Sequence, residues 1–145
     1  MSRVSTVAVA LFTAACALLP AGAAHSADVV RVYEGGDGIC AHHSVLGAIT
    51  RGFRHQVAHV PNLPNVDIVD FYGIYQQRYL PETPKWPIAR LYCAATVQLT
   101  DGQQRPVWYM IEYGQGFAGI GDNVEFCVSG FDRWHAYNGN CRVLR

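Results

Sequence analysis

The segment from Ala89 to Thr100 alternates apolar and polar side chains almost without interruption, and it constrains the fold more than any other part of the chain. Its apolar positions are Leu91, Cys93, Ala95, Val97 and Leu99. Side chains of a β-strand point alternately to its two faces, so this period of two predicts a half-buried strand. Asp101-Gly102 then predicts a hairpin turn, and further antiparallel strands are expected over Val107–Tyr113 and Asn123–Val128.

An amphipathic helix is predicted from Cys40 to about His59. Asp37 is placed to cap its N-terminus, and Pro61 and Pro64 end it. Its apolar stripe, which recurs at helical spacing, is formed by Leu46, Ile49, Phe53 and Val57, flanked by Val45. A helix with one apolar stripe needs a partner layer. We therefore expect an α+β fold in which one N-terminal helix packs on a four- to five-stranded antiparallel sheet.

Four other segments are expected to form strands. Val29–Tyr33 is a short β-branched run, and Val66–Leu80 fits either a helix or a strand, with its β-branched and aromatic content favouring a strand or a turn followed by one. Trp134–Tyr137 and Cys141–Leu144 are predicted to pair around a two-residue turn at Asn138-Gly139. That register places four apolar residues on one face, namely Trp134, Ala136, Cys141 and Val143.

The N-terminal residues 1–27 have the pattern of a signal peptide. Arg3 precedes an apolar run from Val4 to Leu19, and small residues follow, so cleavage is expected near Ala23 to Ala27. The alternative is an uncleaved anchor, because the apolar segment is just long enough to span a bilayer. The prediction is a periplasmic or secreted protein whose residues 28–145 form a single domain, without stable membrane insertion after cleavage.

The charge balance and the cysteine content indicate which partners and which covalent links to expect. Eleven Lys and Arg residues balance eleven Asp and Glu residues, which gives no indication of nucleic acid or of an anionic membrane as a partner. Outside the signal peptide lie four cysteines, Cys40, Cys93, Cys127 and Cys141, which in an exported chain suggest two disulfides. Three pairings are possible. We favour Cys127–Cys141, which closes a short loop within the sheet, and Cys40–Cys93, which ties the helix to the sheet.

The chemistry-bearing motifs are weak. Gly114–Gly119 matches G-x-G-x-x-G, but a strand rather than a helix is expected after it, so it does not predict a dinucleotide site. His55 and His59 have the i, i+4 spacing of metal ligands, although Gln56 stands where a zinc protease has its glutamate. No cofactor is predicted, and these histidines stay weak candidates for a metal site.

Catalysis has little support from the remaining residues. A nucleophilic pair of Cys40 with His42 or His43 would need a free thiolate, which two disulfides remove. Carboxylates at Asp122, Glu125 or Asp132 could act as acid and base, but they sit among turn-forming residues. Whether the protein is an enzyme is uncertain, and the sequence leans against it.

The strongest candidate for binding is the stretch from Phe131 to Tyr137, which interleaves aromatic residues with Arg133 and His135. Its candidate binding residues are Phe131, Arg133, Trp134, His135 and Tyr137. Such side chains can stack on a sugar or hold a peptide; in the alternative interpretation Trp134 fills the core beside a disulfide. The leading hypothesis is an exported non-enzymatic binding protein whose partner is an envelope protein, a peptide or a glycan.

Two alternatives to this hypothesis remain. One is a small secreted hydrolase or metal-dependent enzyme that uses His55 and His59 or the carboxylates between residues 122 and 132. The other is an inhibitor of a secreted enzyme that presents the loops 81–87 and 101–106 as a wedge.

The run from Gly121 to Trp134, followed by Tyr137-Asn138-Gly139 and Cys141–Arg145, resembles a group of small exported bacterial proteins of uncharacterised function. The similarity extends back through Arg90–Cys93 to the helix and covers most of the mature chain. This resemblance implies a bacterial envelope setting and supplies no activity or ligand. In element order the chain also resembles the cystatin-like roll, but Gln76–Leu80 lacks the Q-x-V-x-G wedge of the cystatin inhibitors.

Overall fold

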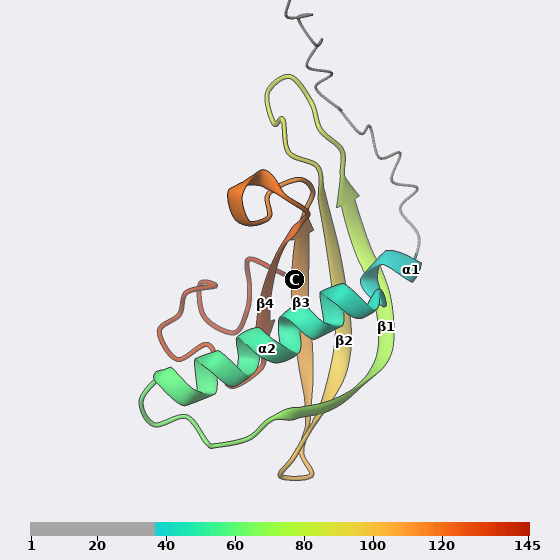
Figure 1. Cartoon of the computed structure of the whole chain (residues 1–145). Coiled ribbons are helices and arrows are strands. Elements are labelled where there is room, and N and C mark those ends of the chain that lie inside the picture. Colours follow the sequence, from blue (N-terminus) through green and yellow to red (C-terminus); the bar gives the residue numbers. More distant parts are fainter. Residues whose placement is uncertain (1–36) are drawn as a thin grey trace, which may run out of the picture. The chain divides into compact units, whose positions relative to one another are not determined.

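The computed structural model describes residues 37–145 (Figure 1). The predicted signal peptide and the predicted strand Val29–Tyr33 lie outside these residues. The elements are, in order, α1 (Asp37–Cys40), α2 (His43–His59), β1 (Ile68–Leu80), β2 (Arg90–Leu99), β3 (Gln104–Glu112), the 3₁₀-helix η1 (Phe117–Gly119) and β4 (Asn123–Val128).

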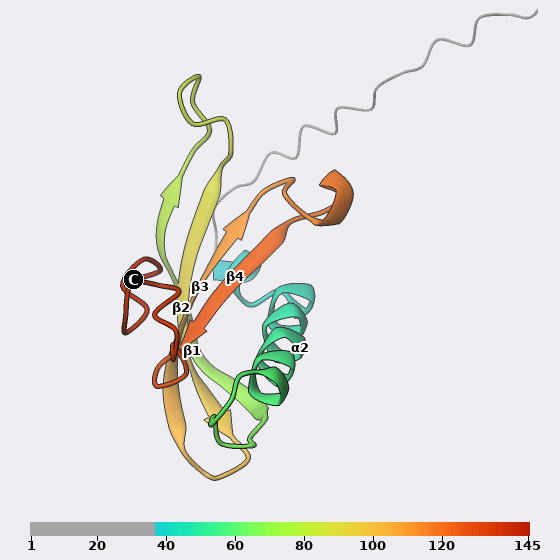
Figure 2. The ribbon, with the colours of Figure 1, turned by 90° about the vertical axis from the view of Figure 1, so that its left-hand side faces the viewer.

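The four strands form one antiparallel sheet in the order β1-β2-β3-β4, so each strand pairs with its neighbours in the chain. Helix α2 lies across one face of this sheet, and the C-terminal segment, residues 129–145, follows the end of β4 (Figures 1 and 2). The predicted α+β class is confirmed, with four strands in the sheet.

The face of the sheet under α2 holds the larger core. The helix contributes Val45, Ile49, Phe53 and Val57, which confirms most of the predicted stripe; Leu46 is only half-buried. The sheet contributes Leu91, Cys93, Val97, Leu99, Val107, Tyr109, Ile111 and Val128. Leu91, Cys93, Val97 and Leu99 belong to the alternating set of β2 that the sequence predicts to face inward. Tyr92 and Ala94 on the other face are buried as well, so the prediction that β2 is only half-buried is wrong for this part of the strand.

Two links fasten α1 to this core. Cys40 forms a disulfide with Cys93 of β2, and the hydroxyl of Tyr109 donates a 2.8 Å hydrogen bond to the carbonyl oxygen of Cys40. Burial raises the pKa of the Tyr109 phenol, so the hydroxyl stays protonated and can donate. The start of the helical region is therefore held to the sheet both covalently and by a buried hydrogen bond.

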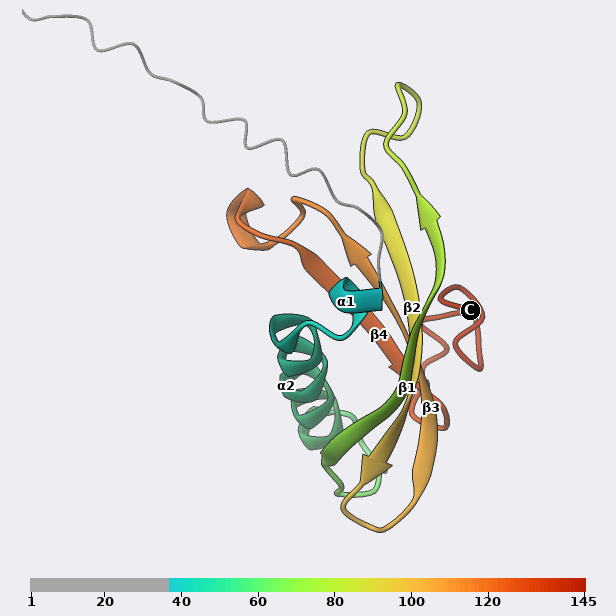
Figure 3. The ribbon, with the colours of Figure 1, turned by 90° about the vertical axis from the view of Figure 1, so that its right-hand side faces the viewer.

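The opposite face of the sheet carries a second, smaller core. It consists of Tyr92, Met110, Cys127, Cys141 and Leu144, with Trp108 and Tyr137 packed against it. The second disulfide, Cys127–Cys141, joins β4 to the C-terminal segment, which folds over this face (Figure 3). The disulfides join the same two pairs that the sequence favours. In a chain of this size they suggest an oxidising, extracytoplasmic setting.

The predicted C-terminal strand pair is wrong. Residues 129–145 form consecutive turns, and the non-glycine residues His135, Asn138, Asn140 and Cys141 all have positive φ angles, which regular strands do not have. Cys141 is fully buried by its disulfide, whereas Trp134 is 70% exposed and Val143 is 52% exposed. The four residues expected on one face are thus separated, because the disulfide and the outer-face core decide where the segment lies.

The helix also begins differently from the prediction. Asp37 is the first residue of the short helix α1 and does not precede one long helix. The helical structure is interrupted at Ala41 and His42 before α2 starts. His42 is the N-cap of α2, where its ring nitrogen accepts a hydrogen bond from the Ser44 backbone N–H. The cysteine bridge at the end of α1 fixes the chain at this break.

The segment Val66–Leu80, for which the sequence favours a strand over a helix, contains the strand β1. Its sequence also fits a helix because β1 is irregular: the register with β2 shifts between Tyr72 and Tyr75, around Gly73, which has a φ of 57°. This irregularity breaks the simple alternation in the sequence. Strand β3 begins at Gln104, three residues earlier than predicted. No helix within residues 37–145 is long and apolar enough to cross a bilayer.

Candidate functional site

The C-terminal segment presents most of the predicted binding residues on the surface. Arg133, Trp134 and His135 are exposed, and Tyr137 is half-buried. Phe131 is only 4% exposed and packs edge-to-face on Phe53 of α2, with ring centroids 4.8 Å apart. Phe131 therefore belongs to the core and positions the segment rather than contacting a ligand.

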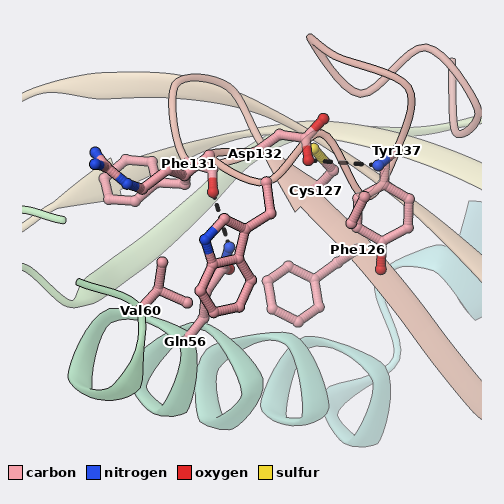
Figure 4. Close-up of a pocket in the computed structure, with 10 residues that line it drawn as sticks. Gln56, Val60, Phe126, Cys127, Phe131, Asp132 and Tyr137 are labelled. Atoms are coloured by element: carbon pink, nitrogen blue, oxygen red, sulfur yellow. Dashed lines mark hydrogen bonds between the residues drawn. The ribbon is translucent and has the colours of Figure 1, made fainter. Parts of the chain in front are cut away.

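A hydrogen bond from α2 holds the base of this segment. The side-chain Nε2 of Gln56 donates to the backbone carbonyl of Phe131 over 2.8 Å (Figure 4). Together with the Phe53–Phe131 ring contact and the Cys127–Cys141 bridge, this bond fixes the segment before and after Trp134. The site is thus carried by ordered elements.

Two hollows adjoin the 132–135 turn. The first is a small cavity of about 50 Å³, and Val60, Phe126, Phe131 and Trp134 are among the residues that line it (Figure 4). The second is an open groove of about 540 Å³ between two parts of the chain that are distant in sequence. Residues 62–64 form one side of this groove, and turns of the segment 130–142 form the other.

Polar side chains line most of the groove on the C-terminal side. They are Asp132, Arg133, His135, Asn138, Asn140 and Arg142. The backbone carbonyl of Asn138 accepts a 2.9 Å hydrogen bond from Arg142 Nε, so Arg142 is oriented by the turn. Two arginines and one carboxylate line this side, so the groove is more positive than the chain as a whole, whose formal net charge is zero.

Asp132 lines both hollows. Its Oδ1 accepts a hydrogen bond from the backbone N–H of Tyr137 at 3.4 Å. Its Oδ2 is buried and has no hydrogen-bond partner among the residues that the structure describes. A buried acceptor left without a partner costs about 1–3 kcal/mol, so Oδ2 destabilises this part of the free protein.

The surroundings of Asp132 also affect Tyr137. Burial raises the pKa of the Tyr137 phenol, and the nearby carboxylates of Glu125 and Asp132 raise it further. Tyr137 therefore remains a neutral side chain at the edge of the small cavity.

The metal and carboxylate candidates lie elsewhere or have structural partners. The rings of His55 and His59 stack 4.0 Å apart on the exposed side of α2, and Nδ1 of His59 lies 2.7 Å from the carbonyl oxygen of His55. Within residues 37–145 no group of three or more His, Cys, Asp or Glu side chains could hold a metal ion. Asp122 accepts a 3.0 Å hydrogen bond from the Gly114 backbone N–H, which gives it a role in the β3–β4 loop.

The predicted inhibitor wedge is not assembled. In an antiparallel sheet of sequential strands, the β1–β2 and β2–β3 connections lie at opposite ends, and the register from Leu80↔Arg90 to Gln98↔Gln104 confirms this for the loops 81–87 and 101–106. Figure 1 shows the two loops at opposite ends of the sheet. They cannot enter one cleft together.

Sequence reasoning identified Trp134 and its neighbours but missed the groove. Residues 62–64 gave no signal, because they become part of the site only when α2 and the C-terminal segment pack together. Asn138 and Asn140 carried the one usable signal, since asparagine tolerates positive φ and predicts turns.

Comparison of this chain with protein-family models, curated proteins and solved structures finds no match.

Proposed function

We propose that this chain is an exported, non-enzymatic binding module that takes a glycan at its C-terminal site. The observation that carries the proposal is the pairing of Trp134, whose indole is 70% exposed, with the buried and unpartnered Oδ2 of Asp132 two residues earlier. An exposed indole beside an acceptor without a donor stabilises nothing in the free protein. A ligand that stacks on Trp134 removes apolar surface from water, and a ligand hydroxyl that reaches Oδ2 when the 132–135 turn opens would give that oxygen a hydrogen-bond partner.

The groups at the site favour a sugar over a purely apolar ligand. An exposed indole offers a flat surface on which a sugar ring can stack. Each sugar hydroxyl both donates and accepts, and the groove supplies an acceptor at Asp132 and donors at Arg133, Asn138 and Arg142. The excess of positive groups adds a preference for a glycan that carries carboxylates.

The framework of the chain supports binding rather than nucleophilic catalysis. All four cysteines of the described region are joined in disulfides, so none offers a thiolate. The stacked pair of His55 and His59 does not line the groove. The polar groups that do line it are suited to hydrogen bonding and charge pairing.

Export completes the proposal. Residues 1–27 have a signal-peptide pattern, and the two disulfides fit an oxidising compartment. The mature protein then begins near Ala23 to Ala27 and works in the periplasm or outside the cell. Mass analysis of the protein recovered from that compartment tests this part, and an intact residue 1–27 segment would contradict it.

The binding proposal is tested on an array of neutral and uronic-acid oligosaccharides with the oxidised mature protein. We expect binding to at least one class, strongest for the acidic sugars. Asp132→Asn should weaken it at least about tenfold, because one amide hydrogen replaces an acceptor. Glu82→Gln is the matched control on a distant loop and should bind normally. Absence of binding to every sugar, or equal binding by Asp132→Asn, would contradict the proposal.

A further inference from the structure

A second surface lies away from the C-terminal site, at the end of the sheet where β1 joins β2 and β3 joins β4. We call it the loop end, and it comprises residues 80–89 and 113–122. Because the four strands alternate in direction, these two connections leave the same end of the sheet. All three ribbon views show both loops projecting beyond the sheet in the same general direction (Figures 1–3).

The loop end exposes large apolar side chains at its tips. Phe117 is 95% exposed and Ile120 is 81% exposed on the β3–β4 loop. Trp86 is 59% exposed on the β1–β2 loop, and Leu80, the last residue of β1, is 45% exposed. Isolated apolar residues on a surface are common, but two projecting loops that each expose large apolar side chains indicate an interaction surface.

Hydrogen bonds within the β3–β4 loop hold its apolar residues outward. Gly116 N–H donates to the Gly121 carbonyl at 3.0 Å, and Ile120 N–H donates to the Phe117 carbonyl at 3.1 Å. A Cβ on Gly116 would lie 2.1 Å from the carbonyl oxygen of Ile120, so only glycine permits this closure. Phe117 and Ile120 are therefore presented on an ordered turn.

The β1–β2 loop is ordered in a similar way. The backbones of Thr83 and Trp86 exchange two hydrogen bonds, of 2.8 and 3.0 Å, in a turn bounded by prolines. Lys85 Nζ lies 5.6 Å from the centre of the Trp86 ring. A tryptophan beside a lysine is suited to the depth of lipid headgroups, where an amphipathic ring and a cation both find partners.

The charges of the loop end favour a neutral partner. Glu82 and Lys85 balance each other on the first loop, and the carboxylate of Asp122 on the second accepts a hydrogen bond from the Gly114 backbone N–H. A folded protein partner would need a surface shaped to two separate projecting tips. A bilayer accepts separate apolar tips without shape complementarity.

We propose that the loop end docks on a zwitterionic lipid bilayer, with Phe117, Ile120 and Trp86 entering the interface. This contact is shallow and reversible, since a few side chains bury far less apolar surface than a spanning helix does. It rests on residues separate from the C-terminal site and does not depend on glycan binding. It would place the protein at a membrane surface after export.

Vesicle sedimentation with phosphatidylcholine tests the proposal on the oxidised mature protein. We expect the protein to sediment with these vesicles, with little change between about 0.05 and 0.5 M salt. The double variant Phe117→Ser/Ile120→Ser should lower the partition coefficient at least about tenfold. The matched control, Val69→Ser/Val143→Ser, changes two other exposed apolar residues and should sediment like the parent protein.

The depth to which Trp86 enters the bilayer is measured by tryptophan fluorescence, with vesicles of brominated lipids and the Trp134→Phe variant. Bromine should quench the emission, and Trp86→Phe should remove most of that quenching. Several results would overturn the proposal. One is that the protein does not sediment with phosphatidylcholine, or that it binds only anionic vesicles and is released at high salt. Another is that the Phe117→Ser/Ile120→Ser variant binds like the parent protein at an unchanged melting temperature. The last is that the loop end captures a protein while the chain binds no vesicles.

Discussion

Gln56 on α2 donates a 2.8 Å hydrogen bond to the backbone carbonyl of Phe131, 75 residues further along the chain. This bond joins the helix to the base of the C-terminal segment, while the Cys127–Cys141 bridge fixes the same segment to β4. The candidate site between these two attachments has no regular secondary structure of its own. Its order therefore depends on contacts with the rest of the domain.

The two disulfides are expected to contribute differently to the free energy of unfolding. Cys40–Cys93 spans 53 residues and Cys127–Cys141 spans 14. Loop-closure entropy then gives about 4 kcal/mol for the first bridge and about 3 kcal/mol for the second. Urea unfolding of the paired serine variants measures both losses.

Limited proteolysis separates the local from the global effect of these bridges. Cys127→Ser/Cys141→Ser should open cleavage sites within residues 129–145 while the sheet stays protected, because the segment loses its covalent attachment. Cys40→Ser/Cys93→Ser should instead expose the whole domain. Equal cleavage patterns for the two variants would contradict this division.

Two glycines of α2 should respond oppositely to alanine. Alanine favours a helix over glycine by about 1 kcal/mol, and at Gly47 the new Cβ meets only the mobile end of Arg51 at 3.2 Å. At Gly52 it would lie 2.6 Å from the ring of Phe126. Overpacking of that kind costs about 1–3 kcal/mol. Thermal unfolding should therefore show Gly47→Ala to be more stable than Gly52→Ala.

Phe126 also lines the cavity near Trp134, so its displacement should be visible at the site. We expect Gly52→Ala to shift the tryptophan emission of a Trp86→Phe background, in which Trp108 and Trp134 remain, and Gly47→Ala to leave it unchanged. A stabilised Gly52→Ala variant with parental emission would show that the helix and β4 are less closely packed than the structure has them.

Glu112 links stability to acid pH. A hydrogen bond from Arg90, with Nε 2.8 Å from Oε1, lowers the pKa of Glu112, and one from Asn123 lowers it further. A lowered folded-state pKa adds stability that is complete above the unfolded value of about 4.3 and is lost as the pH falls through the folded value. Glu112→Gln should lower stability by about 1–3 kcal/mol at neutral pH.

The same variant should lose less stability than the parent protein when the pH is lowered below about 4.3. Denaturant unfolding across this range measures the slope. Glu82→Gln, on the exposed loop, is the control and should keep the parental slope. An unchanged slope in Glu112→Gln would mean that the Arg90–Glu112 pair does not govern the acid response.

Local patterns predicted the parts of the fold that local physics decides. The alternation around Cys93 identified β2, and the helical spacing of Ile49, Phe53 and Val57 identified the buried face of α2. The same patterns set the favoured cysteine pairs, because a strand and a helix that pack together bring Cys40 and Cys93 close.

The C-terminal segment shows where this reasoning fails. Asn138-Gly139 predicts a hairpin locally, but the disulfide at Cys141 and the burial of Leu144 against the outer face fold the chain into successive turns. Trp134 is left on the surface as a result. The groove was also beyond prediction, since residues 62–64 and 130–142 meet only through the tertiary fold.

The most direct test of the proposed function is isothermal titration of Trp134→Ala with the oligosaccharide that binds best, alongside its melting temperature. We predict that binding falls by at least about tenfold, because the stacking surface is lost. The melting temperature should change little, since the indole is 70% exposed. Trp86→Ala, which removes an exposed indole from the loop end, should bind like the parent protein. Parental affinity in Trp134→Ala, or a large fall in melting temperature with binding retained, would contradict the account.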